Sequence, residues 1–200
     1  MATDAALATL DHVWGALAPM GHPVAVMGGI SLAAWNHIRA TRHVDLLIAV
    51  DRNQIDPILS TLASHGCRAK KSPPLVAVGD HCFVQLLYTP PDEFYDVQLD
   101  LMLAESELLQ SALARRVRRD VPGVRIPVDV LHCDDLILLE LVAGRIIDRA
   151  DAAALLRENR DVIDFDYLRM WVARLHLATD FAEVWREAFP DEAPPLTDPA

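Results

Sequence analysis

The chain has 200 residues, of which 52% are hydrophobic and 24% are charged. This length suits one medium-sized domain, or a domain with a small helical appendage, and it allows a real hydrophobic core. Lys and Arg number 18 against 29 Asp and Glu, which gives a formal net charge of -11. The surface as a whole therefore repels a polyanion, and any contact with nucleic acid must use a local basic patch.

The cysteines and the N-terminal residues bear on the cellular compartment. Cys67, Cys82 and Cys133 are widely and irregularly spaced, which fits reduced thiols in a cytoplasm better than a disulfide framework. The N-terminal stretch has acidic residues and no basic segment, and no apolar run approaches the roughly 20 residues that span a bilayer. We therefore expect a soluble, cytoplasmic protein without a membrane partner.

The first third of the chain predicts an opening helix and then two strand-to-helix units. Apolar residues recur near helical spacing over 4–18, and Pro19 with Gly21 stops the run. Asp51 and Asn53 can cap the second unit's helix. The elements after the opening helix are a strand over 23–29, a helix over 30–38, a strand over 44–50 and a helix from 51 to about 66.

The middle of the chain predicts strands, because β-branched and aromatic residues alternate between turns that contain Pro or Gly. Their short connections favour antiparallel neighbours. These strands are expected over 67–71, 74–78, 82–89 and 94–103. A helix over 106–116 and a hairpin over 116–130, with its turn at Pro122 and Gly123, follow.

The last third predicts helices, the first of them capped by Asp134. Further helices are expected over 151–159, 166–177 and 180–189, before a proline-rich acidic tail. We predict an α+β fold, a small mixed β-sheet flanked by helices with a C-terminal helical extension. The expected parts are an α/β core over 1–130, a helical part over 131–189 packed on the core, and a disordered tail over 190–200.

A glycine pair follows the strand over 23–29. Gly28 and Gly29 permit a tight turn and the close approach of a phosphate to the backbone, and Ser31 could add a hydroxyl donor. A glycine pair before a helix can also be only a packing turn.

Acidic residues share strand faces further along the chain. His43 and Asp45 lie two residues apart on one strand, and Asp100 alternates with Gln98 and Asp96 on another. Two carboxylates on adjacent strands, facing a turn that can hold phosphates, suit metal-assisted phosphoryl or nucleotidyl transfer. The alternative is that Asp45 caps a strand edge and Asp100 pairs with an arginine.

Four segments, in order, carry a family resemblance: GGIS, RATRHVD, VQLDLML and DDLILLELVAGRIIDRAD. They resemble the minimal nucleotidyltransferases of the AbiEii-like and related toxin–antitoxin groups, in the DNA polymerase β-like superfamily. The family pattern has GG or GS at a helix start, R-x-T-x-D-x-D, a third Asp on a later strand, and a helix with K-L-x-A-x-R-x-x-D. The resemblance covers about residues 20 to 175 and implies a nucleotidyltransferase-type fold.

The resemblance also implies roles for particular positions. The implied catalytic acids are Asp45 and Asp100, which would bind Mg²⁺ or Mn²⁺ together with the residue at position 43. The implied nucleotide-binding residues for an NTP are Gly28, Gly29, Ser31, Arg39, Thr41 and Arg145.

Two positions depart from the family pattern. His43 stands where the family has its first metal-binding Asp, and imidazole is a poorer magnesium ligand than a carboxylate. Glu140 stands in place of the helical Lys and is expected to repel the triphosphate. Arg39, Arg42 or Arg145 could contact phosphate in place of that Lys.

The function implied by the resemblance is transfer of NMP from an NTP to a hydroxyl acceptor on RNA or protein, at an atypical metal site. The alternative is a catalytically inactive binding or regulatory protein with the same fold. Such a protein could have a cognate partner in a toxin–antitoxin pair.

Three further groups of residues each have two interpretations. The arginines of 115–125 could bind an RNA acceptor or could protect a hairpin edge from aggregation. His81–Cys82 and His132–Cys133 invite a zinc site with His43, but their spacing matches no known zinc pattern and buried cysteines are common in cores. The alternating charges at 145, 148, 149 and 151 indicate a solvated salt-bridge face, or a position beside the nucleotide through the family's R-x-x-D.

Overall fold

The computed structural model describes residues 4–79 and 81–195. It divides into two compact units, each described by itself. The first comprises the described residues within Met1–Ala34 and Ile38–Leu131, and the second those within Trp35–His37 and His132–Ala200. Part of the predicted disordered tail, residues 196–200, lies outside the described residues.

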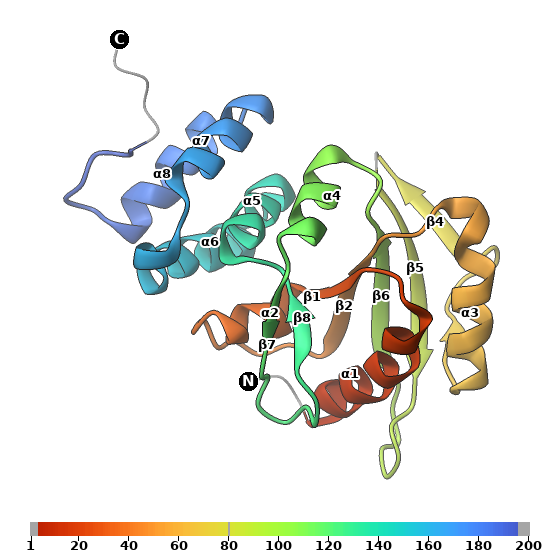
Figure 1. The fold of residues 1–200 in the computed structure, drawn as a ribbon. Helices are drawn as coiled ribbons and strands as arrows, with labels where there is room; N and C mark the ends of the chain where they lie inside the picture. The colour runs from red at the N-terminus through yellow and green to blue at the C-terminus, as the bar shows by residue number, and fades with distance from the viewer. Residues whose placement is uncertain (1–3, 80, 196–200) are drawn as a thin grey trace. The chain divides into compact units, whose positions relative to one another are not determined.

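The first unit is a mixed β-sheet with helices (Figure 1). Its strands are β1 (Val24–Met27), β2 (His43–Ile48), β3 (Arg68–Ala69), β4 (Leu75–Val78), β5 (His81–Tyr88), β6 (Val97–Leu103), β7 (Val117–Arg119) and β8 (Val128–Val130). Its α-helices are α1 (Asp4–Leu17), α2 (Gly28–Ala34), α3 (Ile55–Ser64) and α4 (Glu107–Ala114), with 3₁₀ turns η1 (Ala18–Met20) and η2 (Arg52–Gln54).

The strand order is β3-β5-β6-β2-β1-β8-β7, and β4 also pairs with β5. The pairs β2–β6 and β1–β8 are parallel, whereas the other pairs are antiparallel. The predicted α+β class and the antiparallel pairing of neighbouring strands within 67–103 are therefore confirmed.

The core lies where the buried face of the sheet meets α1 and α3. Strand side chains alternate between faces, so every second residue of β6 is buried, and Leu99 and Leu101 are fully so. Val44 and Leu46 of β2 belong to the same cluster. The residues between these apolar positions face the other side of the sheet. They include the polar residues His43, Asp45, Gln98 and Asp100, which are partly or fully exposed. The polar face is thereby separated from the core by the strands themselves.

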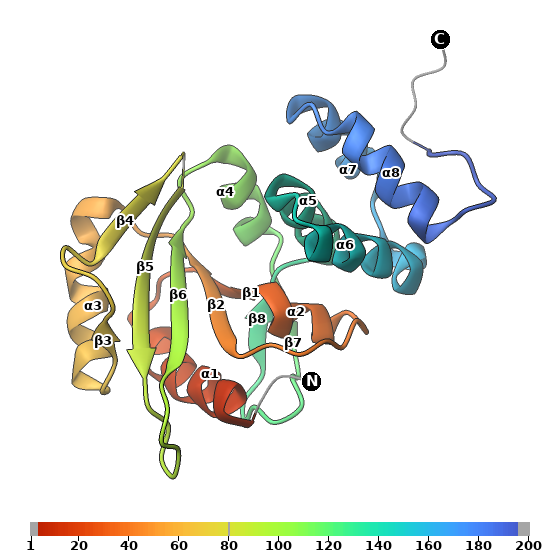
Figure 2. The same cartoon turned by 180° about the vertical axis from the view of Figure 1, so that it is seen from behind.

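Two local predictions differ from the structure. The helix after the glycine pair ends at Ala34, and Asn36 follows with a left-handed φ of 66°. Asp51 and Asn53 do not cap α3; the chain enters α3 through η2, and Asp51 precedes that turn without a side-chain cap bond. Figure 2 shows α2 beside β1 and β2, which it contacts.

The second unit is helical. It contains α5 (Cys133–Ala143), α6 (Ile146–Glu158), η3 (Arg160–Val162), α7 (Phe165–Arg174) and α8 (Ala178–Ala188). The short segment Trp35–His37 belongs to it, because Asn159 Nδ2 donates to the Trp35 carbonyl at 2.8 Å and His37 Nε2 lies 2.9 Å from Asp151 Oδ1. After α8, Glu192 pairs with Arg160 at 2.6 Å. Across residues 4–79 and 81–195, none of the helices has the length and apolar character that a membrane crossing requires.

The predicted salt bridge between Arg145 and Asp148 is present, but the carboxylates of this helix face are not solvated. Asp148 is 0% and Asp151 is 1% exposed. Arg145 holds Asp148 with Nε at 2.8 Å and Nη2 at 2.9 Å, and the Arg145 backbone N–H also donates to it. Burial raises the pKa of Asp148, but the hydrogen bonds from Arg145 and from the Glu140 side chain outweigh burial and lower it.

We expect Arg145→Ala to lower the free energy of unfolding at pH 7 by about 1–2 kcal/mol, because it removes the bonds that hold a buried carboxylate at the start of α6. The pKa of Asp148 is lowered in the folded protein, so its bonds with Arg145 stabilise the fold fully above the ordinary pKa of 3.8. This stabilisation is lost as the pH falls through the pKa that Asp148 has in the folded state. Urea unfolding of both proteins from pH 7 downward should show the difference narrowing below about pH 4.

The matched control is Arg169→Ala, since Arg169 makes the same i,i+3 pair with Asp166 but both side chains are exposed. That variant should stay within about 0.5 kcal/mol of the parent. An equal loss in the two variants, or a loss independent of pH, would contradict the role given to the buried Asp148.

Candidate functional site

The candidate site is built on a pair of carboxylates on neighbouring strands. Asp45 of β2 and Asp100 of β6 are direct partners in the parallel register, so both side chains stand on the same face. Neighbouring strands lie about 4.8 Å apart. Both residues are half-buried, which leaves their oxygens accessible. This arrangement can hold a cation between two hard oxygen donors.

Asp100 is fixed in orientation by two glutamines. Gln98 Nε2 donates to both of its oxygens at 2.9 Å, and Gln85 Nε2 donates to Oδ1 at 3.1 Å. Lys70 Nζ in turn donates to Gln98 Oε1 at 2.6 Å. A carboxylate has about four lone-pair sites, so these three bonds leave Oδ2 able to accept a proton or bind a cation. The alternative in which Asp100 pairs with an arginine is not what the structure shows.

Gln85 and Lys70 are not among the site residues predicted from the sequence. Gln85 is the register partner of Asp100 on β5, and it alternates with the buried residues of an apolar strand. That alternation was a usable signal, because a polar residue inside such a run faces away from the core. Lys70 gave no signal, since it follows a two-residue strand and reaches Gln98 across β5.

The glycine pair lies directly against Asp45 and Thr41. Gly28 has a left-handed φ of 61°, and a Cβ there would overlap the Asp45 carboxylate. A Cβ on Gly29 would lie 2.7 Å from Thr41 Cβ. Both positions therefore require glycine, because the turn approaches Asp45 and Thr41 more closely than a side chain allows. The buried Ser31 hydroxyl donates to the Gly28 carbonyl at 2.8 Å and so braces the turn.

The loop before β2 carries the other predicted residues of the first unit. Thr41 is 9% exposed, and its hydroxyl donates to the His43 carbonyl at 3.4 Å. Arg39 is half-buried, and its Nη1 donates to the Ala40 carbonyl at 3.3 Å. His43 is exposed at the first position of β2, on the face of Asp45 and in register with Gln98. Metal ligation by His43 stays a prediction.

Arg145 and Glu140 belong to the second unit. Glu140 is 8% exposed, and a hydrogen bond from its side chain lowers the pKa of Asp148. The expected repulsion of the triphosphate by Glu140 stays a prediction. A nucleotide contact by Arg145 stays a prediction.

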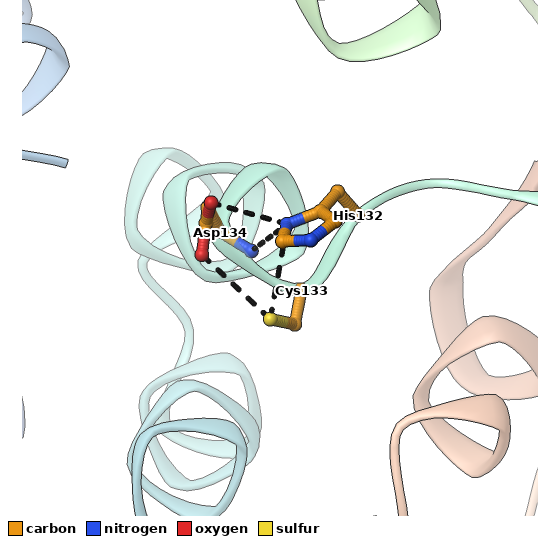
Figure 3. A group of neighbouring side chains, drawn as sticks. All are labelled: His132, Cys133 and Asp134. Atoms are coloured by element: carbon orange, nitrogen blue, oxygen red, sulfur yellow. Dashed lines mark hydrogen bonds and ion pairs between the residues drawn. The ribbon is translucent and has the colours of Figure 1, made fainter. Parts of the chain in front are cut away.

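Within the described parts of the chain, the group of three metal-type donors that lie within 4.8 Å of one another is His132, Cys133 and Asp134 (Figure 3). His132 Nδ1 lies 3.1 Å from Asp134 Oδ2, and Cys133 Sγ donates to Asp134 Oδ1 at 3.7 Å. His132 is the N-cap of α5, with its ring near the Asp134 backbone N–H. The predicted N-cap Asp134 is thus wrong, since Asp134 lies one residue inside the helix.

This group is explained as a helix cap. Burial, followed by the adjacent Asp134 charge, raises the pKa of the Cys133 thiol to about 12. The three donors are consecutive residues that already bond to one another, so the cap accounts for their proximity. Cys82, from the other predicted pair, instead donates to Glu105 in the first unit. The His132–Cys133 pair belongs to the second unit.

The arginines of 115–125 lie at an edge of the sheet, where β7 is the last strand. Arg116 and Arg118 each lie 3.2 Å from Asp129, and Arg125 pairs with Asp11 at 2.5 Å. These ion pairs agree with the interpretation of a protected hairpin edge, and RNA binding by these arginines stays a prediction.

Comparison with protein-family models finds no match, and no curated protein matches the sequence significantly. Solved structures do match. An antigenic nucleotidyltransferase-like protein from Paracoccidioides brasiliensis is 17% identical, with a TM-score of 0.50 over 93% of this chain and 97% of that chain. ANT(2″)-Ia in complex with adenylyl-2″-tobramycin is 14% identical, with a TM-score of 0.53 over 84% of this chain and 96% of that chain. At these identities the likeness concerns the fold, so the predicted nucleotidyltransferase-type fold is confirmed.

Replacement of Gly29 by Ala should lower the free energy of unfolding by about 1–3 kcal/mol, because the new methyl group collides with the buried Thr41. Gly15→Ala is the matched control, since Gly15 lies in α1 with nothing within 4 Å of an added Cβ. There the better helix propensity of Ala should stabilise the protein by up to about 1 kcal/mol. Chemical unfolding curves check both, and equal signs for the two variants would contradict the close contact.

Cys133 should react slowly with iodoacetamide at pH 8. A pKa of about 12, against an ordinary value of 9.0, lowers the thiolate fraction roughly a thousandfold. Mass spectrometry of the native protein over time should show this protection, and unfolding in urea should abolish it. If EDTA alone exposed the thiol to the reagent, a bound metal rather than the helix cap would be the cause.

Proposed function

We propose that the protein is a metal-dependent nucleotidyltransferase that moves NMP from an NTP to a hydroxyl group of an acceptor. The observation that supports this most directly is the parallel register of β2 and β6, which puts Asp45 beside Asp100 next to the Gly28–Gly29 turn. The fold shared with nucleotidyltransferase structures supports the same reaction class.

The residues present fit a hard divalent cation. Asp45 and Asp100 offer carboxylate oxygens on adjacent strands, the donor type that Mg²⁺ and Mn²⁺ prefer. These two residues would hold the ion, and His43 is the neighbouring donor on the same face. When bound, the ion would neutralise charge on the phosphates and favour an in-line attack.

The chain's own residues would then divide the remaining work. The glycine turn would let triphosphate oxygens approach the backbone N–H groups of Gly28 and Gly29, with Ser31 bracing the turn from inside. Arg39 and Thr41 would support the loop that leads into β2. Gln98 and Gln85 would hold the Asp100 carboxylate in one orientation, with Oδ2 able to accept a proton.

In the proposed reaction, the acceptor hydroxyl oxygen attacks the α-phosphorus of the NTP. A bond forms between that oxygen and the α-phosphorus, and the bond to the oxygen that bridges the α- and β-phosphorus breaks. Pyrophosphate leaves with the electron pair of the broken bond. The hydroxyl proton passes to Asp100 and then to solvent.

A second candidate is a non-catalytic protein with the same fold, acting as the binding partner in a toxin–antitoxin pair. The observation that favours it is His43, which leaves two carboxylates on the face where the AbiEii-like pattern has three. Imidazole is a poor magnesium ligand, so such a site would bind metal weakly.

The two candidates can be separated with NTPs radiolabelled at the α-phosphorus, millimolar Mg²⁺ or Mn²⁺, and both RNA and protein acceptors. We expect the native protein to transfer label, and Asp45→Asn and Asp100→Asn each to lower the rate by about 100-fold or more, because each removes a charged ligand. Asp56→Asn, an exposed acid in the first turn of α3, should leave the rate unchanged.

Label transfer that appears only in His43→Asp would identify a decayed site. If neither the native protein nor His43→Asp transferred label from any NTP, the non-catalytic candidate would be favoured. Transfer by the native protein that is unaffected by Asp100→Asn would show that the chemistry lies elsewhere.

A further inference from the structure

A depression of about 560 Å³ lies beside the carboxylate pair in the first unit. It is lined by Arg42, His43, Leu87, Tyr95, Asp96 and Gln98. His43, Gln98 and Leu87 are consecutive register neighbours across β2, β6 and β5. Asp45 and Asp100 lie two residues further along their strands on the same face, which is about 7 Å. The depression therefore opens on the face of the sheet that carries Asp100, two residues along β6 from Gln98.

Two of the lining residues are already engaged. Asp96 accepts from Arg68 Nη2 at 2.5 Å and from the Thr89 hydroxyl at 2.7 Å. Gln98 uses its amide nitrogen on Asp100 and its oxygen on Lys70. The pocket's carboxylate is therefore neutralised by a neighbouring cation, and its amide group is committed to orienting Asp100. Neither of these groups selects a cationic ligand.

The remaining lining groups define the ligand chemistry. Arg42 is exposed and offers a planar, permanently charged guanidinium that suits phosphate. Tyr95 is 53% exposed and offers an aromatic face, and Leu87 adds an apolar wall. The His43 ring completes the wall at the start of β2. A ligand that carries both an anionic group and a flat ring can contact all of these side chains favourably. A polycation, in contrast, would be repelled by the Arg42 guanidinium.

We propose that this depression binds the acceptor, and that the acceptor is a nucleoside phosphate. Its phosphate contacts Arg42, its base lies against Tyr95 and Leu87, and its ribose hydroxyl faces Asp100. The volume falls within the range of sites for one small molecule. The role of the bound nucleoside phosphate as acceptor rests on the proposed function, whereas its binding in the depression does not.

The nucleoside phosphate can be free or can be the terminal nucleotide of a single-stranded RNA. Phe94 distinguishes these sources, because it is fully exposed next to Tyr95 in the loop between β5 and β6. An exposed ring at this position could stack on a second base, which only an RNA supplies. A free nucleotide uses Tyr95 alone.

The test is equilibrium binding without NTP and in the presence of EDTA. A 5′-fluorescein-labelled single-stranded RNA hexamer is titrated with protein and followed by fluorescence anisotropy, and unlabelled AMP is added as competitor. We expect Arg42→Ala to weaken binding of both probes and to reduce the salt slope for the RNA by about 0.7. Tyr95→Ala should weaken both by about fivefold or more, and Phe94→Ala should weaken the RNA alone. Arg125→Ala is the matched control, since it removes the same charge from an exposed arginine whose partner is Asp11.

If AMP displaces the RNA, the pocket is supported and a free nucleotide is a sufficient ligand. If the RNA binds and AMP does not displace it, the pocket is supported as a site for the terminal nucleotide of an RNA. Unchanged binding in both Arg42→Ala and Tyr95→Ala would overturn the assignment. If only the proposed function fails, the outcome is different. Neither the native protein nor Asp100→Asn would then transfer label, yet Arg42→Ala would still bind the RNA more weakly than the native protein. If label is transferred and the acceptor KM is the same in Arg42→Ala and the parent, the acceptor assignment falls and the transferase function stands.

Discussion

The parallel pairing of β2 with β6 is the constraint on which the candidate site depends. It makes Asp45 and Asp100 direct neighbours, and like charges opposite each other on a sheet are destabilising. The register is nevertheless fixed, because a slip of one residue would turn Asp100 into the core and Leu99 out of it. The hydrophobic face of the strands therefore determines the geometry of the polar face. The repulsion is reduced locally, since Gln98 and Gln85 donate to Asp100 and Lys70 brings a positive charge to Gln98.

The features that could be predicted from the sequence were those encoded by neighbouring residues. The alternation in β6 correctly predicted that Gln98 and Asp100 share one face, and turn residues correctly predicted the antiparallel strands after residue 67. The glycine pair also gave a local signal, and the structure adds its reason. Gly28 and Gly29 are needed because Asp45 and Thr41 occupy the space of their missing side chains.

The features that could not be predicted depend on residues distant in the chain. Asp148 and Asp151 have the sequence pattern of a solvated helix face, but Asp151 is buried against His37, which is 114 residues away. Asp134 is a good N-cap by residue type, yet the chain begins α5 one residue earlier and uses His132. The depression next to the acids combines Arg42 and Tyr95, whose proximity follows only from the pairing of β2, β6 and β5.

His43 is where the two proposed properties of the site meet, because it adjoins Asp45 on one side and lines the depression on the other. A carboxylate at this position would add a third negative charge to the face, which favours a second magnesium ion but repels an anionic acceptor in the depression. An imidazole at this position binds magnesium more weakly than a carboxylate, and it does not repel an anionic acceptor. Arg42, Arg68 and Lys70 concentrate positive charge on the same face of a chain whose formal net charge is -11. Under the proposed acceptor chemistry, the imidazole of His43 suits the positive charge on this face, because it spares an anionic acceptor the repulsion that a carboxylate would add.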